Sequence, residues 1–140
     1  MKVRKVENSE IILQKLSGKW WEIDEDLRII VKLDVGILLI TLKKGFETDL
    51  GSIPKFAQSW IDRANDNIIP FLLHDFGYVY GGFGQETWDN LLYQCLRLKG
   101  MGWFKAKMVH KAVSWFGGSH FEDDPEQKHY CKFQWVHKRY

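Results

Sequence analysis

Residues 70–80 read PFLLHDFGYVY and mark the boundary between two parts of the chain with different patterns. Proline is favoured in the first turn of a helix, because its missing N–H would have no partner there. Gly81-Gly82 follows directly, and glycine commonly ends a helix. We therefore predict a helix over Pro70–Tyr80, with mostly extended segments before it and further helices after it.

Two longer segments after residue 80 repeat apolar residues at helical spacing. Gln85–Lys99 is one predicted helix, ended by Gly100, and Trp103–Phe116 is the next, ended by Gly117-Gly118. The supporting apolar positions are Leu91, Leu92, Cys95, Leu96 and Leu98 in the first, and Ala106, Val109, Ala112, Val113 and Phe116 in the second.

The first third of the chain has the composition of β-strands. Trp20–Ile23, Arg28–Leu33 and Ile37–Leu42 are short runs rich in β-branched and aromatic residues, separated by acidic and glycine-containing turns. This pattern predicts a small antiparallel meander, with Ile11–Leu16 as a further strand or a short helix. Gly45–Pro54 has few periodic apolar positions, and we predict an ordered loop that leaves the sheet.

These patterns together predict an α+β fold, a small antiparallel N-terminal sheet packed on a C-terminal bundle of about three helices. A chain of 140 residues is expected to form a single domain. Within it we place a β part and ordered loop over residues 10–54 and a helical part over residues 55–118, which begins with a short helix at Pro54–Ile61. Residues 119–140 are predicted to be a polar and aromatic tail.

Composition and charge exclude several classes of protein. The net charge of +2 lacks the basic footprint of a dedicated nucleic-acid binder, so we expect no specific nucleic-acid partner. Two cysteines far apart make no disulfide framework. The N-terminal residues MKVRKVENSE lack the apolar stretch of a signal peptide, and the longest aliphatic run, Val35–Leu42, is too short to span a bilayer.

Aromatic residues are unusually frequent, with 7 Trp, 9 Phe and 5 Tyr. Several lie in the last part of the chain, where no apolar period explains them as core. We therefore predict that the C-terminal aromatic segment contacts a protein partner or a virion component, and that peripheral contact with lipid is possible.

The predicted helix over Pro70–Tyr80 also carries the residues best suited to chemistry. Phe71, His74, Asp75 and Tyr78 follow at i, i+3, i+4 and i+7, which places them on one stripe of a helix. Glycines at 81, 82 and 84 allow the chain to turn back, so that Asp89 approaches His74 and Tyr78. A carboxylate on one imidazole nitrogen fixes the tautomer and raises the basicity of the other nitrogen, which suits a general base.

Asp75, beside this base, is predicted to bind a divalent cation through oxygen. Asp49, in the segment Thr48–Ser52, supplies a second oxygen ligand or bonds this segment to the helix. Oxygen ligands favour Ca²⁺ over Zn²⁺, and the histidines at 120, 129 and 137 are spaced too irregularly for a zinc site. A structural interpretation stays open beside the catalytic one: the His-Asp-Tyr group pins two helices together, and Asp49 with Ser52 caps a loop.

Several of these motifs occur in one order that resembles a known family. They are Gly45-Phe-Glu-Thr-Asp49 with Pro54, then Leu73-His74-Asp75 with Tyr78, then Asp89, then Phe116-Gly117-Gly118. This order is similar to that of the phage, prophage and bacterial proteins called domain of unknown function 1353. The resemblance implies a phage or prophage source, located in the host cytoplasm or the virion, and no established activity.

The motif His74-Asp75-x-x-Tyr78 is also similar to the catalytic helix of phospholipases A2. The resemblance implies that His74 activates water, Asp75 binds calcium, Asp89 orients His74, and Tyr78 supports Asp89. The chain departs from those enzymes before the helix, where Asn65–Pro70 has neither the glycines of their calcium loop nor a cysteine.

Two functions of different classes follow. One is a phage or prophage accessory or virion-associated protein with a His-Asp site. The alternative is a divalent-metal-dependent hydrolase that cleaves esters as phospholipases A2 do, with His74 as the general base.

Overall fold

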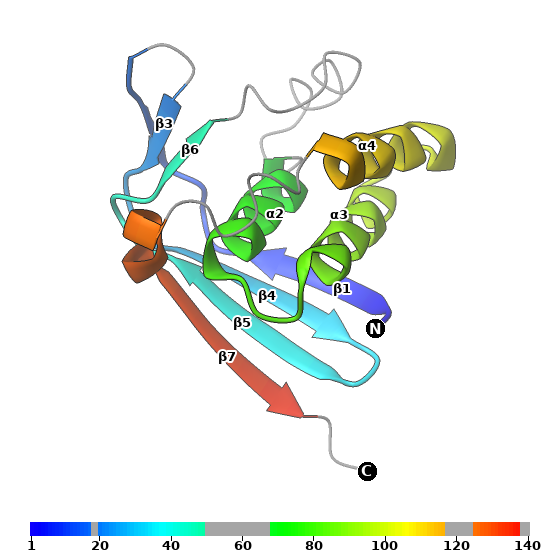
Figure 1. Ribbon diagram of the computed structural model, residues 1–140. Coiled ribbons are helices and arrows are strands. Elements are labelled where there is room, and N and C mark those ends of the chain that lie inside the picture. Colours follow the sequence, from blue (N-terminus) through cyan, green and yellow to red (C-terminus); the bar gives the residue numbers. More distant parts are fainter. Residues whose placement is uncertain (18–19, 50–67, 117–124, 138–140) are drawn as a thin grey trace.

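The computed structural model describes residues 1–17, 20–49, 68–116 and 125–137. Within this part of the chain, helices cover one face of an antiparallel sheet, and a smaller sheet lies at one end (Figure 1). The predicted α+β class, with an antiparallel sheet packed against C-terminal helices, is therefore confirmed. The short helix predicted at Pro54–Ile61 falls outside the described residues.

The larger sheet has four strands in the order β1-β4-β5-β7, and all neighbours are antiparallel. The central hairpin of β4 and β5 matches two predicted strands. In β4 alternate residues from Leu27 to Leu33 are buried, because successive side chains of a strand point to opposite faces. The strand bounds are β1 (Val3–Asn8), β4 (Leu27–Leu33), β5 (Gly36–Leu42) and β7 (Cys131–His137).

The smaller sheet has the order β2-β3-β6, with β2 (Leu13–Lys15), β3 (Trp20–Ile23) and β6 (Glu47–Asp49). The prediction of one meander was wrong for β3, which pairs with β6 instead of continuing into the hairpin. Phe46, which is almost fully buried, accepts a hydrogen bond from the Ile23 N–H at 2.8 Å. After this hydrogen bond the chain runs antiparallel to β3, so Glu47–Asp49 is a strand and not part of a loop.

Two edges of the larger sheet also differ from the prediction. Residues 3–8 form β1, although the predicted β part began near residue 10, and residues 131–137 form β7, although they were predicted to lie in a tail. In β7 the alternate side chains of Cys131, Phe133 and Trp135 pack against the core. The 3-10 helix η4 (Pro125–Tyr130) leads into this strand, and the Tyr130 carbonyl accepts a hydrogen bond from the Lys43 N–H at 2.8 Å.

The three described α-helices follow the predicted periodicity closely. They are α2 (Ile69–Tyr80), α3 (Gln85–Leu98) and α4 (Trp103–Phe116), and each differs from its predicted range by at most one residue at an end. Gly77 of α2 lies directly against the Trp88 ring of α3, where a Cβ atom would overlap the ring. Glycine at this position therefore lets the two helices approach closely.

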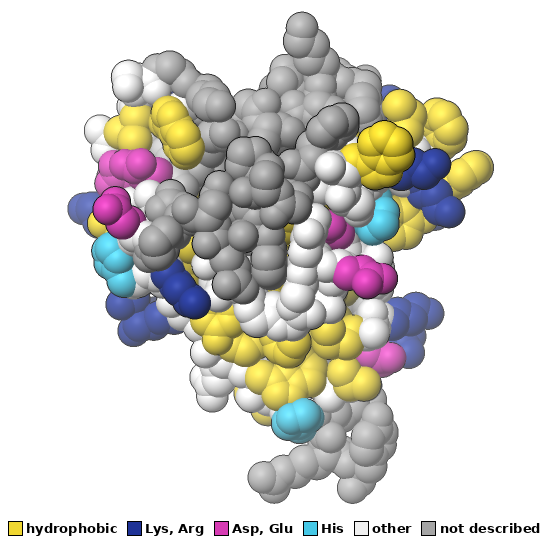
Figure 2. Space-filling model, viewed as in Figure 1, with side chains coloured by type: hydrophobic (Ala, Val, Ile, Leu, Met, Phe, Trp, Pro, Cys, Tyr) yellow, Lys and Arg dark blue, Asp and Glu magenta, His cyan; other side chains and the backbone are white. Residues whose placement is uncertain are grey.

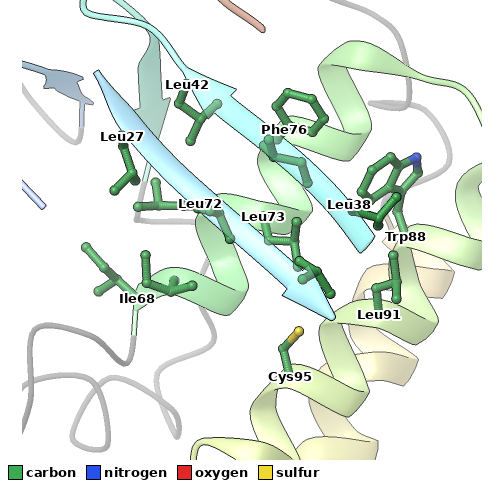
Figure 3. Close-up of a cluster of buried hydrophobic side chains, with 14 of the residues drawn as sticks. Leu27, Leu38, Leu42, Ile68, Leu72, Leu73, Phe76, Trp88, Leu91 and Cys95 are labelled. Carbon is green, nitrogen blue, oxygen red and sulfur yellow. The ribbon is translucent and has the colours of Figure 1, made fainter. Parts of the chain in front are cut away.

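The core lies between the larger sheet and the helix pair α2 and α3. Figure 3 shows side chains of β4 and β5 pointing toward Leu72, Leu73 and Phe76 of α2 and toward Trp88 and Leu91 of α3. A second buried cluster joins α4 to the other two helices through Phe71, Leu92, Leu96, Met101, Ala106 and Val109. Helices α2 and α3 thus form a layer on the sheet. Helix α4 packs on the side of this layer that faces away from the sheet. None of the described helices is both long enough and apolar enough to cross a membrane.

Candidate functional site

A tight turn between α2 and α3 aligns the polar residues of the two helices. Gly81, Gly82, Phe83 and Gly84 all have positive φ, from 55° to 84°, a conformation that glycine adopts at little cost. The Trp88 indole N–H donates to the Gly81 carbonyl oxygen at 2.7 Å and fixes the turn. The chain reverses here, and the first turns of α3 lie beside the last turns of α2.

This reversal brings Asp89 of α3 against His74 and Tyr78 of α2. His74 Nε2 lies 2.7 Å from Asp89 Oδ1, and the Tyr78 hydroxyl donates to the same oxygen at 2.7 Å. The rings of His74 and Tyr78 are one helical turn apart, with centroids separated by 4.1 Å. Three polar residues, each at most 8% exposed, therefore satisfy one another inside the helical layer, as predicted for the polar stripe.

The second oxygen of Asp89 receives two further donors. The Ser114 hydroxyl of α4 donates to Oδ2 at 3.3 Å, and the Gln85 amide of α3 donates to it at 3.5 Å. Neither residue was predicted from the sequence. Gln85 lies four residues before Asp89, a spacing typical of Gln–Asp pairs on a helix, whereas no pattern in the sequence points to Ser114.

Burial and hydrogen bonding act in opposite directions on Asp89. Burial alone raises the pKa of its carboxyl group, but the hydrogen bonds from His74 and Tyr78, the charge of His74 and the bond from Ser114 together hold the pKa below its usual value. The Tyr78 pKa is raised by burial, by its hydrogen bond to Asp89 and by the negative charge of that residue. Asp89 is therefore an ionised acceptor at neutral pH, and Tyr78 is a neutral donor.

An ionised Asp89 determines the tautomer of His74. Because a carboxylate only accepts hydrogen bonds, Nε2 carries a proton in this contact, and a ring with one proton therefore has its lone pair on Nδ1. Within the described part of the chain, Nδ1 has no hydrogen-bond partner. The arrangement can accept a proton at Nδ1 while Asp89 stabilises the resulting imidazolium.

Asp75 lies outside this cluster. Its half-buried carboxylate accepts a hydrogen bond from the Thr48 hydroxyl of β6, which ties α2 to the smaller sheet. Asp49 is the last residue of β6, opposite Trp20, and its side chain falls outside the described residues. Asp49 was predicted to ligate a cation or to bond its segment to the helix, and this stays a prediction; the described contact between β6 and α2 is made by Thr48.

A metal centre is not formed by the described residues alone. Among them, no three His, Cys, Asp or Glu side chains lie close enough together to hold a metal ion. The binding of a divalent cation by Asp75 and Asp49 therefore stays a prediction.

Comparison with known proteins identifies the family. Residues 21–113, which run from β3 into α4, match the family described as "Protein of unknown function (DUF1353)". The match covers most of the chain, and the protein belongs to this family. The matched region begins further toward the N-terminus than the motifs that suggested the resemblance. It includes His74, Asp75, Tyr78 and Asp89. No curated protein and no solved structure matches the chain.

Proposed function

We propose that the protein is an ester hydrolase in which His74 is the general base and Asp89 orients it. The observation that carries this proposal is the 2.7 Å contact between His74 Nε2 and an ionised Asp89. A buried carboxylate on one ring nitrogen leaves the other nitrogen basic, as general base catalysis requires. The similarity of His74-Asp75-x-x-Tyr78 to the catalytic helix of phospholipases A2 supports the choice of an ester substrate.

The proposed reaction uses water as the nucleophile. His74 Nδ1 takes a proton from water as the oxygen attacks the ester carbonyl, and Asp89 stabilises the imidazolium that forms. When the tetrahedral intermediate collapses, the C–O bond to the alcohol breaks and the imidazolium returns its proton to the leaving alkoxide. The products are a carboxylic acid and an alcohol, and Tyr78 holds Asp89 in place throughout by its hydrogen bond.

A divalent cation is a separate part of the proposal. The phospholipase resemblance assigns Asp75 as a ligand, and oxygen ligands favour Ca²⁺ over Zn²⁺. The described residues supply one carboxylate there, Asp75, which also accepts the Thr48 hydrogen bond. No step of the proposed reaction is therefore derived through the ion.

The test is an assay of purified protein on phospholipid vesicles and on short-chain soluble esters. We expect hydrolysis by the wild-type protein and its loss in His74→Ala. Treatment with a chelator followed by added Ca²⁺ or Zn²⁺ measures whether the activity needs an ion and which one. If the folded wild-type protein cleaves no ester, with or without these ions, the hydrolase proposal is wrong.

A second function is favoured by one specific observation. Asp89 accepts hydrogen bonds from all three described helices, through His74 and Tyr78 of α2, Gln85 of α3 and Ser114 of α4. A carboxylate bonded in this way can hold the helices together without taking part in any reaction. Under this second proposal the protein is a phage or prophage accessory or virion-associated protein, in the host cytoplasm or the virion, as the family resemblance implies.

The two proposals differ in what removal of the base does. If the cluster is only a brace, the wild-type protein has no hydrolytic activity, and His74→Ala changes the free energy of unfolding alone. If the cluster is catalytic, activity is lost at temperatures where the variant is still folded.

A further inference from the structure

The outward side of α4 carries large apolar side chains where a solvent-facing helix usually carries polar ones. Ala106, Val109 and Val113, at i, i+3 and i+7, face the other helices. Phe104, Met108 and Trp115 lie on the opposite side at i, i+4 and i+11. Trp115 is 82% exposed, Phe104 is 63% exposed, and Trp103 at the start of the helix is 60% exposed. Single exposed apolar residues are common at protein surfaces. Here three exposed aromatic rings lie on one helix.

Basic side chains are interleaved with these rings. Lys105, Lys107 and Lys111 are exposed on α4, which contains no acidic residue. Within the described part of the chain, none of these three lysines forms an ion pair. Figure 2 shows hydrophobic and basic side chains side by side over α4, at the upper right of the molecule. We call the set Trp103, Phe104, Lys107, Met108, Lys111 and Trp115 the outer face of α4.

We propose that the outer face of α4 is a docking surface for anionic lipid bilayers. Trp and Phe side chains are favoured at the interface between head groups and acyl chains, and Lys side chains beside them attract anionic head groups. A helix that combines exposed aromatic residues with unpaired lysines matches both parts of such a surface. The positive charge of the exposed lysines favours an anionic bilayer over a neutral one, because only anionic head groups attract these side chains.

Two other occupants fit these residues less well. In a symmetric dimer through this face, the lysines of one copy would lie opposite those of the other, and like charges repel. A nucleic acid would satisfy the lysines, but the centre of the outer face is occupied by Phe104, Met108 and Trp115, and the chain as a whole is nearly neutral.

The location of this surface relates it to the polar cluster. Ser114, which donates to Asp89, directly precedes Trp115, and the Val113 carbonyl oxygen lies 3.4 Å from the Tyr78 hydroxyl. A bilayer bound to the outer face of α4 would thus lie one helix away from His74. The docking proposal stands without the proposed hydrolysis, because binding is measured separately from turnover.

The test is cosedimentation of the full chain with vesicles of phosphatidylcholine alone and of phosphatidylcholine mixed equally with phosphatidylglycerol. We expect binding to the anionic vesicles and not to the neutral ones. The double variants Phe104→Ser with Trp115→Ser and Lys107→Glu with Lys111→Glu should each weaken binding roughly tenfold or more. His74→Ala should bind as the wild-type protein does, so failure of docking and failure of hydrolysis are distinguishable.

Control substitutions come from β7, which exposes one apolar and one basic side chain, Val136 and Lys132, away from α4. Val136→Ser and Lys132→Glu should leave vesicle binding unchanged, and circular dichroism should show all variants folded. The proposal is overturned if the protein does not bind anionic vesicles, or if the β7 variants weaken binding as much as the α4 variants. It is also overturned if the α4 variants alter only self-association or binding to single-stranded nucleic acid.

Discussion

Asp89 accepts four hydrogen bonds that hold the polar cluster together, from His74 and Tyr78 at one oxygen and from Ser114 and Gln85 at the other. Because four donors point at one carboxylate whose pKa lies below its usual value, ionisation of Asp89 stabilises the native structure. Removal of a partner from a buried polar network costs more than the mean value of a hydrogen bond, because the remaining groups stay buried without partners. Substitution of Asp89 is therefore expected to destabilise the fold whether or not the site is catalytic.

The dependence of stability on pH follows from the pKa of Asp89. The native pKa lies below the ordinary value, so the unfolded chain takes up the proton first as the pH falls. The carboxylate thus stabilises the fold above about pH 4, the ordinary pKa of an unfolded aspartate, and this contribution is lost as the pH falls through the native value. Thermal unfolding should show a melting temperature that decreases below about pH 4.

Asp89→Asn should remove part of this decrease, because an amide does not titrate. Asp24→Asn, in the turn after β3, serves as the matched control and should leave the profile as in the wild-type protein. Equal pH profiles for the wild-type protein and Asp89→Asn would contradict the role assigned to this carboxylate.

Much of the cluster was predictable because its members are close in sequence. His74 and Tyr78 are one helical turn apart, and the glycines between 81 and 84 limit where the next helix can lie. Ser114 was not predictable, because its contact depends on how α4 packs against α3, which is determined by a buried cluster of residues far apart in the chain. Thr48, which bonds Asp75, was also missed, because its contact joins two elements that are far apart in the sequence.

At the scale of elements, the contact between α2 and α3 depends on Gly77. A Cβ atom at this position would overlap the Trp88 ring, which is fully buried and hydrogen-bonded to the turn. Gly77→Ala should therefore destabilise the protein by about 1–3 kcal/mol, the usual cost of overpacking, even though alanine favours helices. Denaturant unfolding measures this change.

Gly102→Ala is the matched control, because nothing lies within 4 Å of a Cβ atom built there. Its effect on the free energy of unfolding should be smaller than that of Gly77→Ala. If the two substitutions have the same effect, the close approach of α2 and α3 at Gly77 is not a determinant of stability.

The helices were predicted well and the sheet edges poorly, for a physical reason. A buried helix face repeats apolar residues over several turns, so the signal accumulates. An edge strand is short and half exposed, and β1, with the sequence VRKVEN, contains few apolar residues. In β7, apolar and polar residues alternate only over residues 131–135, after a long aromatic and polar segment that hides the period.

For the whole molecule, β7 joins the C-terminal part of the chain to the core. The Phe133 ring lies 5.0 Å from that of Tyr80 and 5.5 Å from that of Phe83, measured between centroids. Phe133→Ala should therefore lower the free energy of unfolding by about 2 kcal/mol, less than for a fully buried ring because Phe133 is partly exposed.

Gln134→Ala, on the exposed side of the same strand, should change the free energy of unfolding little. An unchanged free energy of unfolding in Phe133→Ala would mean that the contacts of Phe133 with Tyr80 and Phe83 do not stabilise the fold.

The proposed function depends on His74, oriented by Asp89, acting as the general base. The direct measurement is the rate of ester hydrolysis by His74→Asn, at a temperature where thermal unfolding shows the variant to be folded. His110→Asn is the control, since His110 contacts Asn90 outside the cluster. We expect a loss of at least about 100-fold for His74→Asn, the usual contribution of a general base, and little change for His110→Asn. Equal rates for wild-type protein and His74→Asn, or no hydrolysis by wild-type protein, would contradict it.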